Sequence, residues 1–170
     1  MRSIAIRRAE SGDLPAVLDC LATAFEPYRA LYTPAAFEDT VLSAGTAARR
    51  MREMTILVAV DPTEGVVGTI AIAAAGAGEG HVRGMAVRPR HQGAGVAARL
   101  LRAAERELKS LGCSRVTLDT TRPLERAIRF YTRHGYRATG VVRDFFGMPL
   151  FEYAKDLGGE ASPEAGSNEG

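Results

Sequence analysis

The stretch that decides the fold is Arg88-Pro89-Arg90-His91-Gln92-Gly93-Ala94-Gly95-Val96-Ala97-Ala98. A β-type segment over residues 81–87 precedes it and an amphipathic helical pattern follows, so the order is strand, basic glycine-rich loop, helix. Backbone N–H groups at a helix start lack partners and carry the positive end of the helix dipole. Gly93 and Gly95 let the backbone approach an anion closely, and the basic residues of the loop, Arg88, Arg90 and His91, add charge. The stretch therefore predicts a diphosphate-binding loop.

The same glycines also fit a dinucleotide-binding fingerprint. Residues 93–98 match G-x-G-x-x-G/A, and Asp119 ends the next predicted strand about 20 residues on. Residues 88–92 separate the strand from the first glycine, however, whereas the dinucleotide turn is tight. The chain after Asp119 also has little room for a second βαβ half, so topology disfavours this alternative.

Hydrophobic periodicity places the other elements around this unit. Strands are expected at residues 4–6, 55–60, 66–73, 81–87, 116–118, 136–142 and 150–154, and helices at 14–25, 33–52, 97–111 and 123–134. Gly45 interrupts the weaker pattern of residues 33–52, which is consistent with one helix or two short ones. The order predicts an α/β (α+β) fold, a mixed sheet with helices packed on it.

Composition favours one ordinary domain. The chain has 170 residues, of which 46% are hydrophobic, and its 22 Lys and Arg against 20 Asp and Glu give no reason to expect nucleic acid or a membrane surface as partner. Residues 66–78 are the longest uncharged run, too short for a membrane helix of about 20 apolar residues, and the N-terminus lacks a secretory signal, so we expect a cytoplasmic protein. We expect a domain over residues 1–157 and a disordered tail over 158–170.

Two cysteines, Cys20 and Cys113, complete this inventory. Neither has a partner at a metal-type spacing, and each lies in or beside an apolar segment. We therefore expect both to be reduced, buried thiols, and we expect no metal site.

Two ordered motifs resemble the GNAT superfamily of N-acetyltransferases. Residues 90–95 are similar to the family's Arg/Gln-x-x-Gly-x-Gly/Ala pyrophosphate loop, with Leu100-Leu101 at the usual spacing. Residues 127–136, Ala-Ile-Arg-Phe-Tyr-Thr-Arg-His-Gly-Tyr, resemble the second signature, Ala-Ile-x-Phe-Tyr-x-x-x-Gly-Phe/Tyr. The resemblance covers roughly residues 3–157 and is strongest over 80–140. It implies a mixed, mostly antiparallel central sheet of about seven strands flanked by about four helices.

The resemblance also implies the chemistry: direct transfer of an acetyl group from acetyl-CoA to a primary amine in a ternary complex. Tyr131 would protonate the departing sulfur, although it could instead only pack beside Phe130 in the core. A backbone N–H of residues 85–87 would polarise the thioester carbonyl. The residues implied to contact the cofactor are Met85, Ala86, Val87, Arg90, His91, Gln92, Gly93, Ala94, Gly95, Val96, Ala97, Ala127 and Tyr131.

The sequence departs from the family pattern at two places. Arg83 and Gly84 stand where many members have a carboxylate, which leaves Glu79, His81 or an ordered water as the general base. Leu124 stands where many members have an asparagine. Arg122 or Arg126 could supply the missing polar contact, but we interpret the arginines at 126, 129 and 133 as a solvated helix face.

The acceptor remains open at the level of sequence. Glu26, Tyr28, Tyr32 and the segment 145–149 could wall a site for a cationic amine, or could be plain packing. The sequence does not distinguish among five kinds of acceptor: a protein N-terminus, a lysine, a polyamine, an amino acid and an antibiotic amine. Two other functions stay open as well, a non-catalytic acyl-CoA-sensing module and a small dinucleotide-binding domain. The last strands could also support a homodimer.

Overall fold

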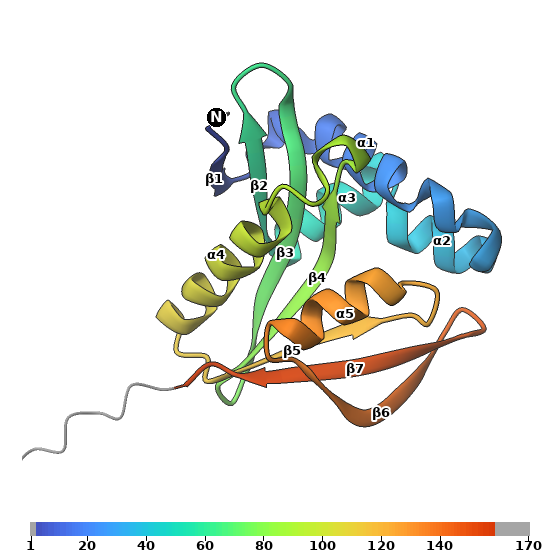
Figure 1. Ribbon diagram of the computed structural model, residues 1–170, viewed down its shortest axis with the longest axis vertical. Coiled ribbons are helices and arrows are strands. Elements are labelled where there is room, and N and C mark those ends of the chain that lie inside the picture. The colour runs from blue at the N-terminus through green and yellow to red at the C-terminus, as the bar shows by residue number, and fades with distance from the viewer. Residues whose placement is uncertain (1–2, 159–170) are drawn as a thin grey trace, which may run out of the picture.

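The computed structural model describes residues 3–158, in which seven strands form one sheet and five α-helices pack on it (Figure 1). The strands are β1 (Ala5–Arg8), β2 (Thr55–Asp61), β3 (Gly65–Gly76), β4 (Glu79–Val87), β5 (Arg115–Thr120), β6 (Arg137–Phe145) and β7 (Met148–Asp156). The helices are α1 (Leu14–Phe25), α2 (Pro34–Val41), α3 (Ala44–Glu53), α4 (Val96–Ser110) and α5 (Glu125–Arg133). The tail expected over residues 158–170 lies, from residue 159 onward, outside the described residues.

The sheet has the order β1-β2-β3-β4-β5-β7-β6, and β4–β5 is its parallel pair while the other neighbours are antiparallel. This confirms the predicted mixed, mostly antiparallel α/β (α+β) sheet. The stretch at residues 33–52 forms two helices, but Gly45 is not the break. Leu42 takes a positive φ of 64°, and the Ser43 side chain caps α3 by accepting a hydrogen bond from the N–H of Thr46.

Helices cover both faces of the sheet (Figure 1). On one face, Leu100, Leu101, Ala104 and Leu108 of α4 are fully buried against β2–β5, and each large side chain contributes roughly 1.5–3 kcal/mol by its burial. Gly80 makes this close packing possible, because an added Cβ would lie 2.8 Å from a methyl carbon of Leu108. On the other face, α1 packs against β3 and β4.

Three local expectations need correction. The spacing of apolar residues in 14–25 predicts a buried stripe of Leu14, Val17, Leu18, Leu21, Ala22 and Phe25. The structure instead buries Val17, Cys20, Leu21 and Ala24, while Leu18 is half-buried and Ala22 is exposed. Pro123 is expected in the first turn of the helix at 123–134, but α5 begins two residues later, at Glu125. The expected strands at 136–142 and 150–154 leave a loop between them, but β6 and β7 extend into this segment. Only Phe146 and Gly147 form the turn, with positive φ values of 50° and 88°.

The centre of β4 is the feature that positions the site. Ala71 pairs with Arg83 and Thr69 pairs with Ala86, which leaves Gly84 and Met85 opposite a single residue of β3, a β-bulge. Gly84 takes a left-handed φ of 61°, which glycine tolerates without strain. Within residues 3–158, β4 pairs with β5 only as far as Val82. The two strands therefore separate, and the second half of β4 has one open edge.

Both cysteines are buried and free, as predicted. Burial raises the pKa of the Cys20 thiol to about 11, so this thiol stays protonated and unreactive at neutral pH. No helix in the described part of the chain combines the length and the apolar character needed to cross a membrane.

Candidate functional site

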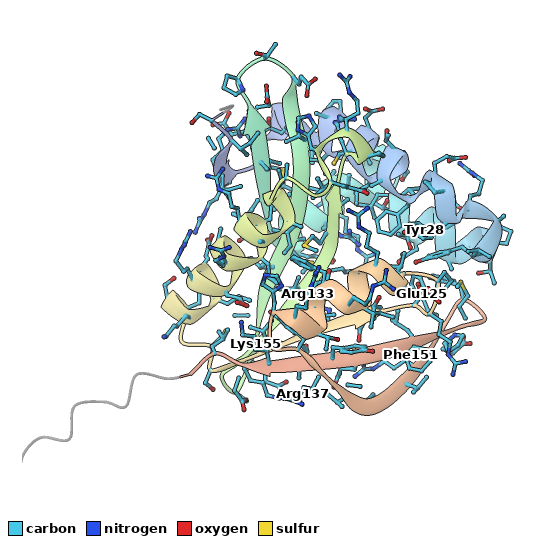
Figure 2. All side chains as sticks on the ribbon, in the orientation of Figure 1. Tyr28, Glu125, Arg133, Arg137, Phe151 and Lys155 are labelled. Atoms are coloured by element: carbon cyan, nitrogen blue, oxygen red, sulfur yellow. The ribbon has the colours of Figure 1, made fainter. Side chains whose placement is uncertain are left out.

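A cavity of about 570 Å³ opens beside the second half of β4. Its walls come from β4, the loop before α4, the start of α4, α5, the α2 and α3 helices, and the short 3-10 segment η2 (Glu26–Leu31). In Figure 2, Tyr28 lies on the η2 side, while Glu125 and Arg133 mark the two ends of α5 on the other side. One continuous cavity thus joins the glycine-rich loop to the N-terminal helices.

The loop end of the cavity offers backbone donors. Gly93 and Gly95 have left-handed φ values of 81° and 83°, and Gly95 caps α4 without a side-chain hydrogen bond. The first helical bond of α4 joins the N–H of Arg99 to the carbonyl of Gly95, so the N–H groups of residues 93–98 have no protein acceptor within the described chain. Such a row of free N–H groups at a helix N-terminus binds phosphate well.

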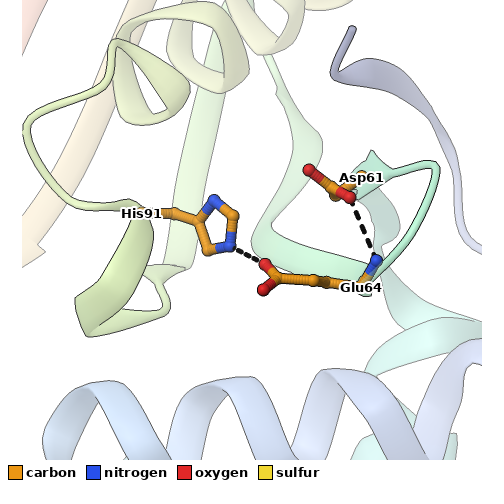
Figure 3. Close-up of side chains that lie close together, drawn as sticks. All are labelled: Asp61, Glu64 and His91. Atoms are coloured by element: carbon orange, nitrogen blue, oxygen red, sulfur yellow. Dashed lines mark hydrogen bonds and ion pairs between the residues drawn. The ribbon is translucent and has the colours of Figure 1, made fainter. Parts of the chain in front are cut away.

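The charged side chains of the loop are turned toward other partners. His91 pairs with Glu64 of the β2–β3 turn, where Asp61 accepts the N–H of Glu64 at 3.0 Å (Figure 3). Arg90 is exposed and lies 3.5 Å from Glu64. Arg88 is held at α1, by Asp19 at 2.5 Å, and donates to the carbonyl of Val66 at 2.8 Å. The loop is thereby anchored on both sides by its own side chains.

Arg126 lies over this loop, so the interpretation of this residue as part of a solvated helix face was wrong. Its Nη1 donates to Gln92 Oε1 at 3.0 Å, and Gln92 Nε2 in turn donates to the carbonyl of Val87 at 3.0 Å. A Cβ added at Gly93 would lie 3.9 Å from Arg126 Nη2. Arg126 therefore belongs to the cavity and not to a purely solvated face, whereas Arg122 lies over the ring of Phe151. Leu124 lines the cavity where the family often has an asparagine.

Tyr131 of α5 is both a core residue and a cavity residue. It is 8% exposed, packs edge-on against Tyr136 at 5.8 Å between ring centroids, and still lines the cavity. Burial raises the pKa of its hydroxyl well above the ordinary value, so the phenol keeps its proton. No hydrogen bond of this hydroxyl occurs within residues 3–158. Tyr131 thus combines packing in the core with a place on the cavity wall.

Only one of the two side chains considered as a base reaches the cavity. His81 lines it, with Nδ1 bonded to Thr117 Oγ1 at 2.9 Å and Nε2 3.7 Å from Asp119. Burial lowers the pKa of His81 below its ordinary value, against the opposing charge of Asp119, so the imidazole is neutral at pH 7. Glu79 pairs with Arg115 at 2.5 Å and is not among the cavity residues of the described chain.

The far end of the cavity is built by side chains from the N-terminal helices. Tyr28 and Tyr32 line it, and the Tyr32 hydroxyl shares a hydrogen bond of 2.6 Å with Thr121. Glu26 instead pairs with Arg29 outside this cavity. Asp39, Arg50 and Arg83 line this end as well, and sequence patterns gave no sign of Asp39 or Arg50.

The structure brings together most residues implied to contact the cofactor. The cavity is lined by Met85, Ala86, Val87, His91, Gln92, Gly93, Gly95, Val96, Ala97, Ala127 and Tyr131. Arg90 and Ala94 are not among its lining residues.

Comparisons with known proteins agree with this arrangement. The chain shares its fold with an acetyltransferase of the GNAT family from Staphylococcus aureus Mu50, at 15% identity and a TM-score of 0.75 over 92% of this chain and 100% of that one. A PaiA N-acetyltransferase from Thermoplasma acidophilum, solved in complex with coenzyme A, gives 20% identity and a TM-score of 0.72 over 91% and 99%. An IAA acetyltransferase from Bacillus cereus ATCC 14579 gives 18% and 0.67 over 91% and 99%.

Sequence comparison points the same way. No curated protein sequence matches the chain significantly. The family model described as "Acetyltransferase (GNAT) family" matches residues 15–136, which include β4, the glycine-rich loop and α5. The chain therefore belongs to the GNAT acetyltransferase family.

Proposed function

We propose that this protein is an N-acetyltransferase that moves the acetyl group of acetyl-CoA directly to a primary amine bound in the same cavity. The observation that carries the proposal is the continuity of the cavity, from the free N–H groups of residues 93–98 to the pocket between η2 and α3. A cofactor bound at one end and an acceptor bound at the other would meet at the β4 bulge.

The residues at the loop end fit coenzyme A. Left-handed glycines and unpaired N–H groups suit its pyrophosphate, and Arg126 adds a cation at the same place. The open edge of β4 beyond Val82 suits the amide-bearing pantetheine arm, which could pair with it like a short strand. Coenzyme A is also the ligand in the Thermoplasma structure of the same fold.

The chain's own groups can then serve the transfer. Acetyl-CoA supplies an activated thioester when bound. A backbone N–H near Met85, freed by the bulge, polarises the carbonyl, and a preorganised donor of this kind stabilises charge that develops in the transition state. Tyr131 holds a proton beside the sulfur position and donates it as the thiolate leaves.

His81 is the proposed general base. It is neutral at pH 7, lines the cavity on the β4 strand that carries the bulge, and is oriented by Thr117. A neutral imidazole can accept the proton that the attacking amine must lose. An ordered water relayed by His81 would serve the same purpose without direct contact.

The dinucleotide alternative fits the sheet poorly. A doubly wound fold needs a second βαβ half, whereas β4–α4–β5 is the one parallel unit in residues 3–158 and β5 continues into antiparallel β7. Asp119, the candidate ribose ligand, is engaged by Arg143 at 3.3 Å.

The test is to incubate the protein with acetyl-CoA and each of a panel of primary amines, and to measure turnover as release of the CoA thiol. The proposal expects amine-dependent release and a mass increase of one acetyl group on the acceptor. Tight acetyl-CoA binding without release for any amine would favour the acyl-CoA-sensing alternative instead.

We also propose a single catalytic domain over residues 1–157 and a homodimer through the edge strand β6. Size-exclusion chromatography with light scattering would detect the dimer.

A further inference from the structure

The guanidinium of Arg50 is the feature that the proposed mechanism leaves unused. Arg50 comes from α3, is 8% exposed and lines the cavity. No hydrogen bond or ion pair of its side chain occurs in the part of the chain that the structure describes. Burial, with a contribution from nearby Arg83, lowers the pKa of Arg50 to about 10, which still leaves it charged at pH 7. A buried unpaired charge is costly, so a ligand that pairs with it gains affinity.

The charges around Arg50 do not balance. Asp39 is the nearby carboxylate, and it already pairs with Arg83 at 2.7 Å. His81 is neutral, and Asp119 faces Arg143 and His81. This end of the cavity therefore holds two guanidinium groups against one committed carboxylate. It has one unit of positive charge left for a ligand.

Gly84 places that charge close to the reaction centre. A Cβ at Gly84 would lie 2.7 Å from Arg50 Nη1, so the guanidinium lies directly against this glycine. Gly84 is also half of the bulge whose neighbour, Met85, is proposed to polarise the thioester. An anion bound by Arg50 would therefore lie close to the bulge at which the thioester is proposed to react. Thr120 lines the same cavity, and its buried Oγ1 has no hydrogen-bond partner within residues 3–158.

We propose that the acceptor is a small amine that also carries a carboxylate, of the amino-acid class, and that Arg50 binds this carboxylate. This inference rests on the proposed acetyltransferase function. A monoanionic carboxylate matches the single unmatched charge better than a phosphate does, and a guanidinium binds it through two parallel hydrogen bonds. The binding orients the amine toward the thioester and excludes amines without a nearby anion.

The test compares each member of a panel of free amino acids with its own carboxamide, at saturating acetyl-CoA. The carboxamide has the same shape and a more readily neutralised amine, so a preference for the acid reports on the carboxylate. We expect the acid to show at least a tenfold higher kcat/KM than its amide in the native protein. Arg50→Met should reduce that ratio to about 1, and Arg50→Lys should retain part of it.

The matched control is Arg52→Met, an exposed arginine of the same helix outside the cavity, which should leave the ratio unchanged. Thermal unfolding separates ligand binding from a structural role. Because Arg50 is unpaired in the free protein, Arg50→Met should keep or raise the Tm. An acid-to-amide ratio that stays the same in Arg50→Met, or a native protein that prefers amides or phosphorylated amines, would overturn the inference.

Two further outcomes separate this inference from the proposed function. Acetylation confined to amines without an anionic group would overturn the inference and leave the acetyltransferase intact. A preference for succinyl-CoA over acetyl-CoA that Arg50→Met abolishes would place the carboxylate on the acyl group instead, and would also overturn it. Failure to bind acetyl-CoA at all would overturn both.

Discussion

The polar groups at the two ends of the cavity come from different kinds of structure. At the loop end, free backbone N–H groups and left-handed glycines lie within one short segment, and His91 and Arg88 brace that segment from outside. At the far end, which we propose binds the acceptor, the polar groups are side chains of α2, α3, β4 and β5, which are far apart in the chain. The first end is local in sequence, and the second exists only after folding. We expect the first to set cofactor affinity and the second to set acceptor choice.

The largest effect is expected on the acceptor side, at His81. His81→Gln keeps a polar side chain but removes the basic nitrogen, and kcat/KM for the amine should fall by roughly 10²-fold at pH 7. Because burial lowers the pKa of His81, the native protein should lose kcat/KM only below about pH 6.5, as the imidazole becomes protonated. A pH–rate profile measures this, and an acid limb that persists unchanged in His81→Gln would remove His81 from the chemistry.

Tyr131→Phe tests the point where the two ends meet. Turnover should fall about tenfold, less than for the base, because a thiolate is a competent leaving group even without an acid. The acetyl-CoA dissociation constant should stay the same, since the ring and its packing against Tyr136 are retained. Steady-state kinetics and calorimetry give the two quantities. Full activity in this variant would make Tyr131 a core residue only.

Gly93→Leu tests the loop end by itself. The substitution blocks backbone approach at a left-handed φ of 81°, so the acetyl-CoA dissociation constant should rise about tenfold, or about 1.4 kcal/mol. Gly140→Leu is the matched control, because Gly140 has a φ of 89° on β6, outside the cavity residues of the described chain. It should lower the Tm without changing the dissociation constant. Equal weakening in both variants would mean that backbone strain alone is responsible.

The smallest effect is expected at Arg126. Arg126→Met removes one cation from above the loop and its bond to Gln92, and exposed charge contacts are weak, so acetyl-CoA affinity should fall about threefold. The difference in acetyl-CoA affinity between the native protein and Arg126→Met should shrink at high salt, because salt screens exposed charges. Arg129→Met, on the same helix and outside the cavity residues of the described chain, is the control. A loss of acetyl-CoA affinity as large as that of Gly93→Leu would show that side-chain charge, and not the backbone alone, sets cofactor affinity at the loop end.

Sequence reasoning went furthest where function depends on local backbone. The order of elements follows from hydrophobic periodicity within short windows, and the glycine-rich loop and Tyr131 were singled out by short motifs that resemble those of a known family. Arg50 and Asp39 could not be found this way, because they look like ordinary charged residues of weakly patterned helices until tertiary packing places them in the cavity wall. Arg126 was misread for the same reason, since an exposed helical arginine gives no local sign of the loop beneath it.

The most direct test of the account is thermal unfolding of the native protein in the presence of acetyl-CoA and, separately, NAD. A ligand at 100 times its dissociation constant stabilises the fold by about 2.7 kcal/mol, so binding is easily detected. The Tm should rise with acetyl-CoA, by less in Gly93→Leu, and should not rise with NAD. A rise with NAD and none with acetyl-CoA would contradict it.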